Sequence, residues 1–249
     1  MGKNFPSYPE KKMKYTTIKN TRIQRVSRLC YGTGLSRYHG HRLLVTAYKK
    51  YGINFWDTAD CYGTQKDVGK ALKEVGRDNV AIMTKIDSTT ETGARNKIKI
   101  ALKEMKTKYL DIVLLHGIQG MADFARRKPA LKVLLNYKNK GIIKAVGFST
   151  HSSPKAVLKA PKEIDVILAS ISEARIDRGT KEEMIAALKS QKHKGIIAMK
   201  VFGAGKHIHE YKKRMNFAIK HKFIDALNIG MTNEREIKQN ANYIYKHYK

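Results

Sequence analysis

The sequence predicts an α/β protein: a single (β/α)8 barrel preceded by a short β-hairpin. An apolar strand followed by a helical stretch recurs eight times along the 249 residues. The strand segments are apolar on both faces, as in a parallel sheet covered by helices. A doubly wound open sheet is the alternative, but no glycine-rich G-x-G-x-x-G turn follows the first strand.

The elements follow one another in a regular order. Strands are expected at residues 29–34, 54–59, 80–86, 110–116, 145–149, 166–171, 196–202 and 226–229. Helices, most of them amphipathic, are expected at residues 41–51, 66–75, 92–106, 122–138, 154–159, 181–192, 209–220 and 234–245. Pro129 is expected to break or kink the fourth helix, because proline has no backbone N–H to donate.

The remaining segments indicate one domain with a tail. Residues 13–26 predict a hairpin around Lys19 and Asn20 that would close the bottom of the barrel. Residues 1–11 are expected to be an N-terminal tail and residues 12–249 one barrel domain, since no linker or low-complexity segment divides the chain.

Charge and cysteine content limit the class of protein. The chain has 50 Lys+Arg against 21 Asp+Glu, a formal net charge of +29, which attracts anions. The basic residues are spread over almost every helix, so nucleic acid is not expected as a specific partner. Cys30 and Cys61 are the two cysteines, too few for a disulfide framework or a cysteine-based metal cluster. No apolar run is long enough to span a bilayer, so a cytoplasmic monomer or weak oligomer is expected.

Four polar residues stand at or just after the ends of three successive predicted strands. Asp57 and Tyr62 follow the second strand, Lys85 ends the third and His116 ends the fourth. The carboxyl ends of barrel strands meet at one mouth, so these side chains are expected to be neighbours. Lys85 would lower the pKa of Tyr62, Asp57 would hold Lys85 charged, and His116 would orient a carbonyl oxygen. The set predicts a general acid, Tyr62, for an oxygen that gains negative charge.

These residues resemble the catalytic residues of aldo-keto reductases. Residues 52–63, GINFWDTADCYG, are similar to the family motif around its catalytic Asp and Tyr, and Lys85 and His116 match its catalytic Lys and His positions. The resemblance extends over residues 12–245. It implies NADPH or NADH as hydride donor, a small-molecule aldehyde or ketone as acceptor, and Tyr62 as proton donor.

The resemblance also implies which residues bind the cofactor, and it implies no metal. They are Ser149, Lys200, Phe202, Gly203, Gly205, Thr232, Asn233, Glu236 and Asn240. Glu236 has capping-box spacing from Asn233. It also stands where many family members carry the Arg that holds the 2′-phosphate of NADPH. A carboxylate there would repel that phosphate, but Arg235 and Lys238 flank it, so NADPH and NADH both remain open.

Other functions remain open at this stage. Departures from the family pattern at Leu168, Met199 and Glu236 favour a non-catalytic nucleotide-binding regulatory or scaffold protein. A nucleic-acid-associated protein is suggested by the net charge alone. A Schiff-base lyase would use Lys85 as an uncharged amine, whereas Asp57 would keep it protonated. The short loop at residues 117–120 and the end of the chain after the last helix predict an open, shallow substrate pocket.

Overall fold

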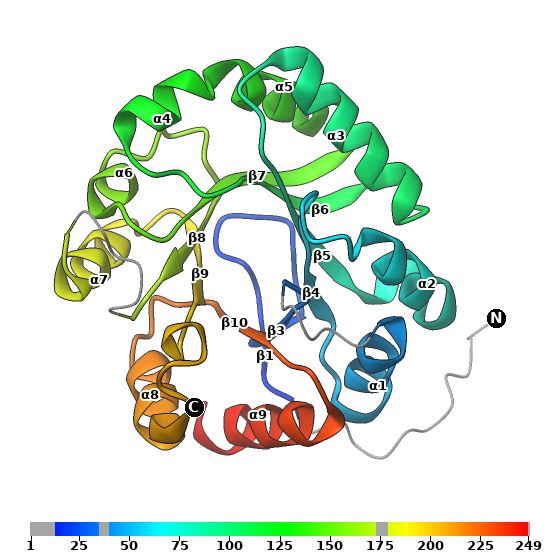
Figure 1. The fold of residues 1–249 in the computed structure, drawn as a ribbon, viewed down its shortest axis with the longest axis vertical. Coiled ribbons are helices and arrows are strands. Elements are labelled where there is room, and N and C mark those ends of the chain that lie inside the picture. The colour runs from blue at the N-terminus through cyan, green and yellow to red at the C-terminus, as the bar shows by residue number, and fades with distance from the viewer. Residues whose placement is uncertain (1–12, 35–39, 173–178, 249) are drawn as a thin grey trace.

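A computed structural model describes residues 13–34, 40–172 and 179–248 and confirms the predicted barrel. Eight parallel strands close on themselves in the order β10-β3-β4-β5-β6-β7-β8-β9, and the helices surround them (Figure 1). The predicted tail at residues 1–11 lies outside the described residues.

The bounds of the elements are close to those expected. The barrel strands are β3 (Leu29–Gly32), β4 (Phe55–Asp57), β5 (Ala81–Ile86), β6 (Leu110–Leu115), β7 (Ile143–Thr150), β8 (Val166–Ser170), β9 (Gly195–Met199) and β10 (Ala226–Gly230). The helices are α1 (His41–Tyr51), α2 (Gln65–Val75), α3 (Glu91–Glu104), α4 (Met121–Arg126), α5 (Lys128–Asn139), α6 (Pro154–Leu158), α7 (Lys181–Ser190), α8 (Tyr211–Ile219) and α9 (Glu234–His247). In the described part of the chain, no helix is both long and apolar enough to cross a membrane.

The break expected at Pro129 divides the fourth predicted helix into α4 and α5. Arg127 lies between them, and Pro129 occupies the first turn of α5, where its missing N–H removes no helical hydrogen bond. Arg127 fixes the junction, because its guanidinium bonds Asp123 at 3.1 Å and Asp87 at 2.5 Å.

The strands predicted at residues 29–34 and 54–59 end two residues early, and the largest boundary error is in the seventh predicted strand. The seventh predicted strand, residues 196–202, ends at Met199, and Lys200 takes a left-handed backbone conformation with φ of 58°. The chain then turns through η2 (Gly203–Gly205) and η3 (Ile208–Glu210) instead of extending the strand. The apolar character of Val201 and Phe202 suggested a strand, but both side chains pack in the core between the barrel and the helices.

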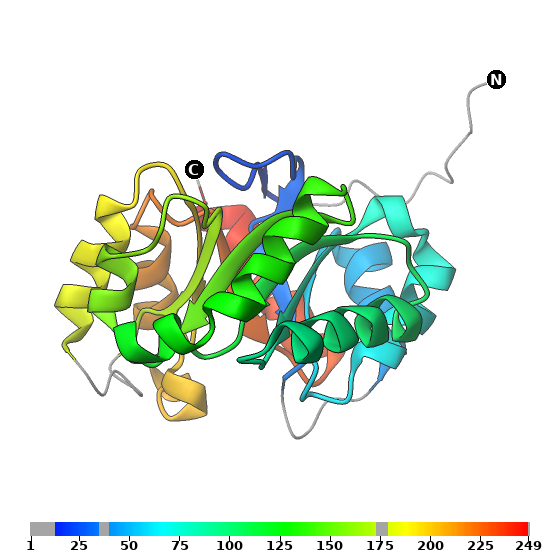
Figure 2. The ribbon, with the colours of Figure 1, turned by 90° about the horizontal axis from the view of Figure 1, so that it is seen from above.

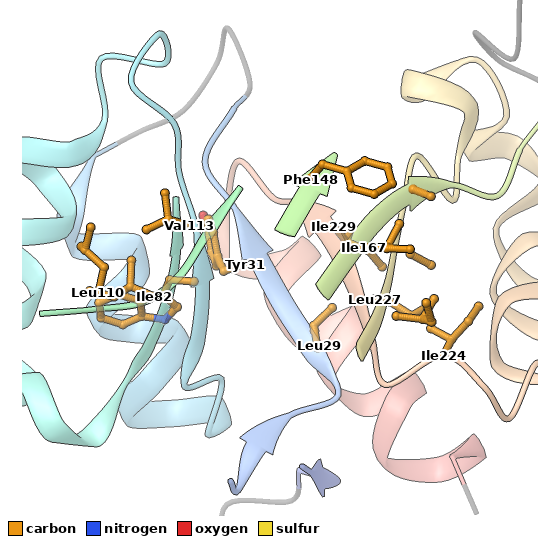
Figure 3. Packing of buried hydrophobic residues seen from close by; sticks show 14 of the residues in the cluster. Leu29, Tyr31, Ile82, Leu110, Val113, Phe148, Ile167, Ile224, Leu227 and Ile229 are labelled. Carbon is orange, nitrogen blue, oxygen red and sulfur yellow. The ribbon is translucent and has the colours of Figure 1, made fainter. Parts of the chain in front are cut away.

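Alternation along the strands decides which side chains enter the barrel. Inward-facing residues include Cys30, Phe55, Met83, Ile112, Leu114 and Ala226. Residues packed between barrel and helices include Tyr31, Ile82, Val113 and Leu227 (Figure 3). The next inward positions toward the carboxyl ends of β4, β5 and β10 are the polar residues Asp57, Lys85 and Asn228. Because every second side chain of a strand faces inward, these three polar side chains point into the same end of the barrel.

The predicted hairpin is confirmed at the opposite end of the barrel. Its strands β1 (Tyr15–Thr16) and β2 (Val26–Ser27) pair antiparallel, and Figure 2 shows the hairpin capping one end of the strands. Ile18 and Ile23 are buried with the inward-facing residues. The hairpin thus fills the bottom of the barrel with apolar side chains, which leaves the other end for the polar groups.

Candidate active site

A buried chain of polar contacts links three strands at the mouth. The Lys85 ammonium donates to Asp57 Oδ1 at 2.5 Å and to the Thr58 carbonyl at 2.9 Å. Asn228 donates from Nδ2 to the other Asp57 oxygen at 2.8 Å. Lys85 and Asp57 are 2% and 3% exposed, so this ion pair is almost sealed from water. Both Asp57 oxygens are occupied, which fixes the carboxylate and the ammonium that it holds.

Tyr62 and His116 complete the predicted tetrad, by which we mean Asp57, Tyr62, Lys85 and His116. The Lys85 Nζ lies 4.7 Å from the centre of the Tyr62 ring, and the Tyr62 and His116 rings meet edge to face with centroids 5.7 Å apart. Gly34 makes room for the tyrosine, because a Cβ there would lie 2.5 Å from Tyr62 Cε2. The structure therefore brings all four residues together at the carboxyl ends of β4, β5 and β6.

The ionisation of Lys85 follows the expectation. Burial alone lowers the pKa of Lys85, but the Asp57 carboxylate and Tyr62 outweigh it and hold that pKa above its ordinary value. Lys85 is therefore a stable cation at neutral pH, which disfavours its use as a free amine.

The predicted direction of the pKa shift of Tyr62 was wrong. Lys85 does lower the pKa of Tyr62, but burial of the phenol raises it by more, so the pKa lies above its ordinary value of 10.0. Burial and Lys85 together lower the pKa of His116 below 6.5. At neutral pH the mouth therefore presents a protonated phenol, a neutral imidazole and an ammonium cation.

Sequence reasoning missed several residues that shape this mouth. The hydroxyl of Thr64 lies 2.7 Å from that of Thr33 and 2.8 Å from that of Thr58, and Thr33 also donates to the Asp57 carbonyl at 2.9 Å. These buried threonines tie the ends of β3 and β4 to the start of α2. Asn228 was also missed, although a polar residue at an inward position of an apolar strand is a signal for it.

The predicted cofactor residues of β7 and β9 lie at the same end of the barrel. Ser149 is the next-to-last residue of β7, and its buried hydroxyl accepts from the Gly117 N–H at 2.8 Å. Lys200 follows β9, and Gly203 and Gly205 have φ of 57° and 96°. These positive angles favour glycine. Gly203 is buried against the His207 ring, whereas Ala204 and Gly205 are exposed.

The turn after β9 is joined to α9 through one tyrosine. The ring of Phe202 stacks on Tyr211 with centroids 5.3 Å apart, and the Tyr211 hydroxyl donates to Asn240 Oδ1 at 2.9 Å. Burial raises the pKa of Tyr211, which keeps it a donor. Phe202 and Asn240 are thereby held together although 38 positions separate them in sequence.

Thr232, Asn233 and Glu236 form the N-terminus of α9. The Asn233 side chain accepts from the Glu236 N–H at 3.0 Å, which is the expected cap. The Glu236 carboxylate accepts from the Thr232 N–H at 2.8 Å and from the Asn233 amide at 3.0 Å. It thus bonds the residue before the cap rather than the Asn233 N–H that a capping box uses. The carboxylate is fixed at the position where, by the resemblance, many family members carry the Arg that holds the 2′-phosphate.

Comparison with known proteins agrees with the fold. A profile of the Aldo/keto reductase family matches residues 29–247. The chain is similar to "Probable aldo-keto reductase 1" of Glycine max, with 27% identity over 62% of this chain and 47% of that protein. It is also similar to methylglyoxal reductase DkgA of Escherichia coli strain K12, with 30% identity over 42% of this chain and 39% of that protein.

These alignments span less than half the length of the two curated relatives. In three dimensions the fold matches the holo form of aldo-keto reductase AKR11C1 from Bacillus halodurans with a TM-score of 0.77 at 20% identity, over 93% of this chain and 91% of that one. The family match covers most of the chain, including every residue of the tetrad. The chain belongs to the aldo/keto reductase family.

Proposed function

We propose that this chain reduces an aldehyde or ketone to an alcohol with NADPH or NADH as hydride donor, and that Tyr62 is the general acid. The observation that carries the proposal is the sealed contact chain from Asn228 through Asp57 and Lys85 to the Tyr62 ring. A cation held this firmly beside a phenol serves a reaction in which negative charge develops on an oxygen. The similarity to methylglyoxal reductases suggests small aldehydes as the first substrates to test.

The hydrogen-bond donors and the cations at the mouth suit the groups of a nicotinamide cofactor. The exposed backbone at residues 204–205, with Lys200 and Lys206 beside it, suits a pyrophosphate. The amide of Asn240 lies at the same end. When bound, the cofactor would supply the hydride to the carbonyl carbon. Ser149, whose hydroxyl accepts from the Gly117 N–H, would bind the carboxamide group.

The protein's own residues handle the proton. The Tyr62 hydroxyl donates its proton to the carbonyl oxygen as negative charge forms there, and the Lys85 cation stabilises the phenolate that remains. Asp57 and Asn228 hold Lys85 in place, and the neutral His116 orients the oxygen. Saturable binding of NADPH or NADH at a salt concentration that screens the +29 charge, together with turnover of aldehydes, would support this function. Cofactor binding without turnover of any carbonyl would favour a nucleotide-binding regulator instead.

The raised pKa of Tyr62 sets the expected pH dependence. A general acid works in its protonated form, which is present below its pKa, and burial puts that pKa above 10.0. We therefore expect kcat for reduction to stay flat from about pH 7 to pH 9 and to fall only above the ordinary tyrosine range. Oxidation of the alcohol needs the phenolate, so its rate should rise throughout this interval. Initial rates in both directions across the interval measure this, and a reduction rate that falls tenfold per unit from pH 7 would contradict the assigned acid.

Glu236 is expected to set the discrimination between the two cofactors. Its carboxylate is held by the Thr232 N–H and cannot turn away without losing that bond. We expect Glu236→Gln to improve the affinity for NADPH about tenfold relative to NADH, because a like charge near the 2′-phosphate is removed. Glu234→Gln is the matched control, since Glu234 lies in the same helical turn but pairs with Lys50 and Tyr51. Dissociation constants for both cofactors measure the ratio; an unchanged ratio in Glu236→Gln would place the 2′-phosphate elsewhere.

A further inference from the structure

Beside the tetrad, the structure gathers three side chains with metal-binding atoms. Asp60 and Cys61 lie in the loop that leads from β4 to Tyr62, and His116 follows β6. One ligand atom from each lies within 4.8 Å of the other two, and Cys61 Sγ is 3.6 Å from His116 Nδ1. Carboxylate oxygen, cysteine sulfur and imidazole nitrogen are the ligand types that Zn²⁺ takes in proteins. The proposed reduction uses neither Asp60 nor Cys61.

A second, independent observation at Asp60 points to a cation. The Asp60 side chain is 9% exposed. Its Oδ2 atom is paired with the Lys97 ammonium and accepts from the Asp87 N–H at 3.0 Å. Its Oδ1 atom is buried and has no hydrogen-bond partner. A buried carboxylate oxygen without a partner destabilises the fold, and a bound cation would remove that cost.

We propose that Asp60, Cys61 and His116 bind a thiophilic divalent cation of the Zn²⁺ class, with a fourth position left for water. Lys97 compensates part of the charge of the Asp60 carboxylate, and the Cys61 thiol would release its proton to solvent as it binds the ion. Cys61 is exposed, so an ion can reach the sulfur from solvent. A sulfur ligand selects soft or borderline cations over Mg²⁺ and Ca²⁺, which prefer oxygen ligands.

Binding of this ion lowers the rate of carbonyl reduction, and this consequence rests on the proposed function. Zn²⁺ holds its Cys, His and carboxylate ligands at about 2.0–2.3 Å, which sets tetrahedral ligand atoms about 3.3–3.8 Å from one another. Cys61 Sγ and His116 Nδ1, 3.6 Å apart, already lie within this range, and the ligand oxygen of Asp60 lies within 4.8 Å of both. An ion bound to both atoms ties the His116 ring to the loop of Cys61, so the ring can no longer adjust its position to the carbonyl oxygen. Displacements of about 1 Å in a reacting constellation cost up to about 10²-fold in rate.

Cobalt(II) is the probe that tests the site, because its spectrum reports a bound thiolate. We expect titration of the reduced full chain, without cofactor or substrate, to give one equivalent of Co²⁺ with a thiolate-to-cobalt charge-transfer band in the near ultraviolet. Zn²⁺ should displace the cobalt and abolish the band. Cys61→Ser should remove the band and weaken Zn²⁺ binding about tenfold or more, because it removes the soft ligand. Asp60→Asn should weaken binding while keeping the band.

Cys30→Ala is the matched control, since Cys30 is the other cysteine and is fully buried in the barrel. It should keep the cobalt band. Absence of the band in the wild-type chain, or Zn²⁺ affinity unchanged in Cys61→Ser, would overturn the site. These readouts do not involve turnover, so a chain that binds cobalt but fails to reduce carbonyls would refute the proposed function alone. Conversely, active enzyme that shows no cobalt band would refute the metal site alone.

Discussion

Replacing Tyr62 by Phe is expected to lower kcat for carbonyl reduction by about 10²–10⁴-fold while leaving cofactor affinity unchanged. The phenyl ring keeps the packing against Gly34, the contact with the Lys85 cation and the edge-to-face contact with His116. The variant therefore removes the proton that the carbonyl oxygen needs and little else. Steady-state turnover of a small aldehyde, with cofactor binding followed separately, measures both parts of the expectation.

A matched control for this variant is Tyr109→Phe. That hydroxyl donates to Asp78 at 2.7 Å on an exposed part of the molecule away from the tetrad. We expect Tyr109→Phe to leave kcat unchanged. If Tyr62→Phe kept wild-type turnover, Tyr62 would not be the acid, and the proton would have to come from another group at the mouth.

Replacing Lys85 by Met is expected to damage stability and activity together. The substitution leaves the Asp57 carboxylate buried beside Asn228 without its cation. Breaking a buried ion pair from one side costs about 3–5 kcal/mol in the free energy of unfolding. The loss of positive charge beside Tyr62 should also lower kcat by about 10²-fold or more. Chemical denaturation measures the first effect and turnover by the folded fraction measures the second.

The double variant Asp57→Asn with Lys85→Met separates these two effects. It removes the unpaired Asp57 carboxylate. A neutral polar group costs less free energy to bury than a lone carboxylate, so we expect at least about half of the lost free energy of unfolding to be recovered. Turnover should stay low, because the cation beside Tyr62 is still missing. A stability loss below about 1 kcal/mol in Lys85→Met, or recovered turnover in the double variant, would contradict the role given to the pair.

Much of this site could be predicted from local sequence pattern. Lys85 and Asp57 lie in phase with the inward-facing apolar residues of their strands, so strand alternation alone aims them into the barrel. Pro129 marked the break between α4 and α5 correctly. Such features depend on residues that are close in the sequence, so they can be predicted from one sequence.

Other features depend on closure of the barrel and could not be predicted in that way. Asn228 meets Asp57 across 171 positions, because β10 returns to pair with β3. The pKa of Tyr62 depends mainly on how deeply the folded chain buries its ring. The sequence suggested only the smaller effect, the lowering of this pKa by Lys85. The group of Asp60, Cys61 and His116 arises where two loops meet in space. In each case tertiary contact decides the chemistry.

Transfer of deuterium from reduced cofactor that carries deuterium in place of both hydrogens at nicotinamide C4 tests the central claim most directly. The labelled NADPH or NADH is incubated with the chain and a small aldehyde, and the alcohol is analysed by mass spectrometry. We predict one deuterium on the former carbonyl carbon in the wild-type product, and little product with Tyr62→Phe. Saturable binding of the labelled cofactor with no deuterated alcohol from any of a range of aldehydes and ketones would contradict the assignment as a reductase.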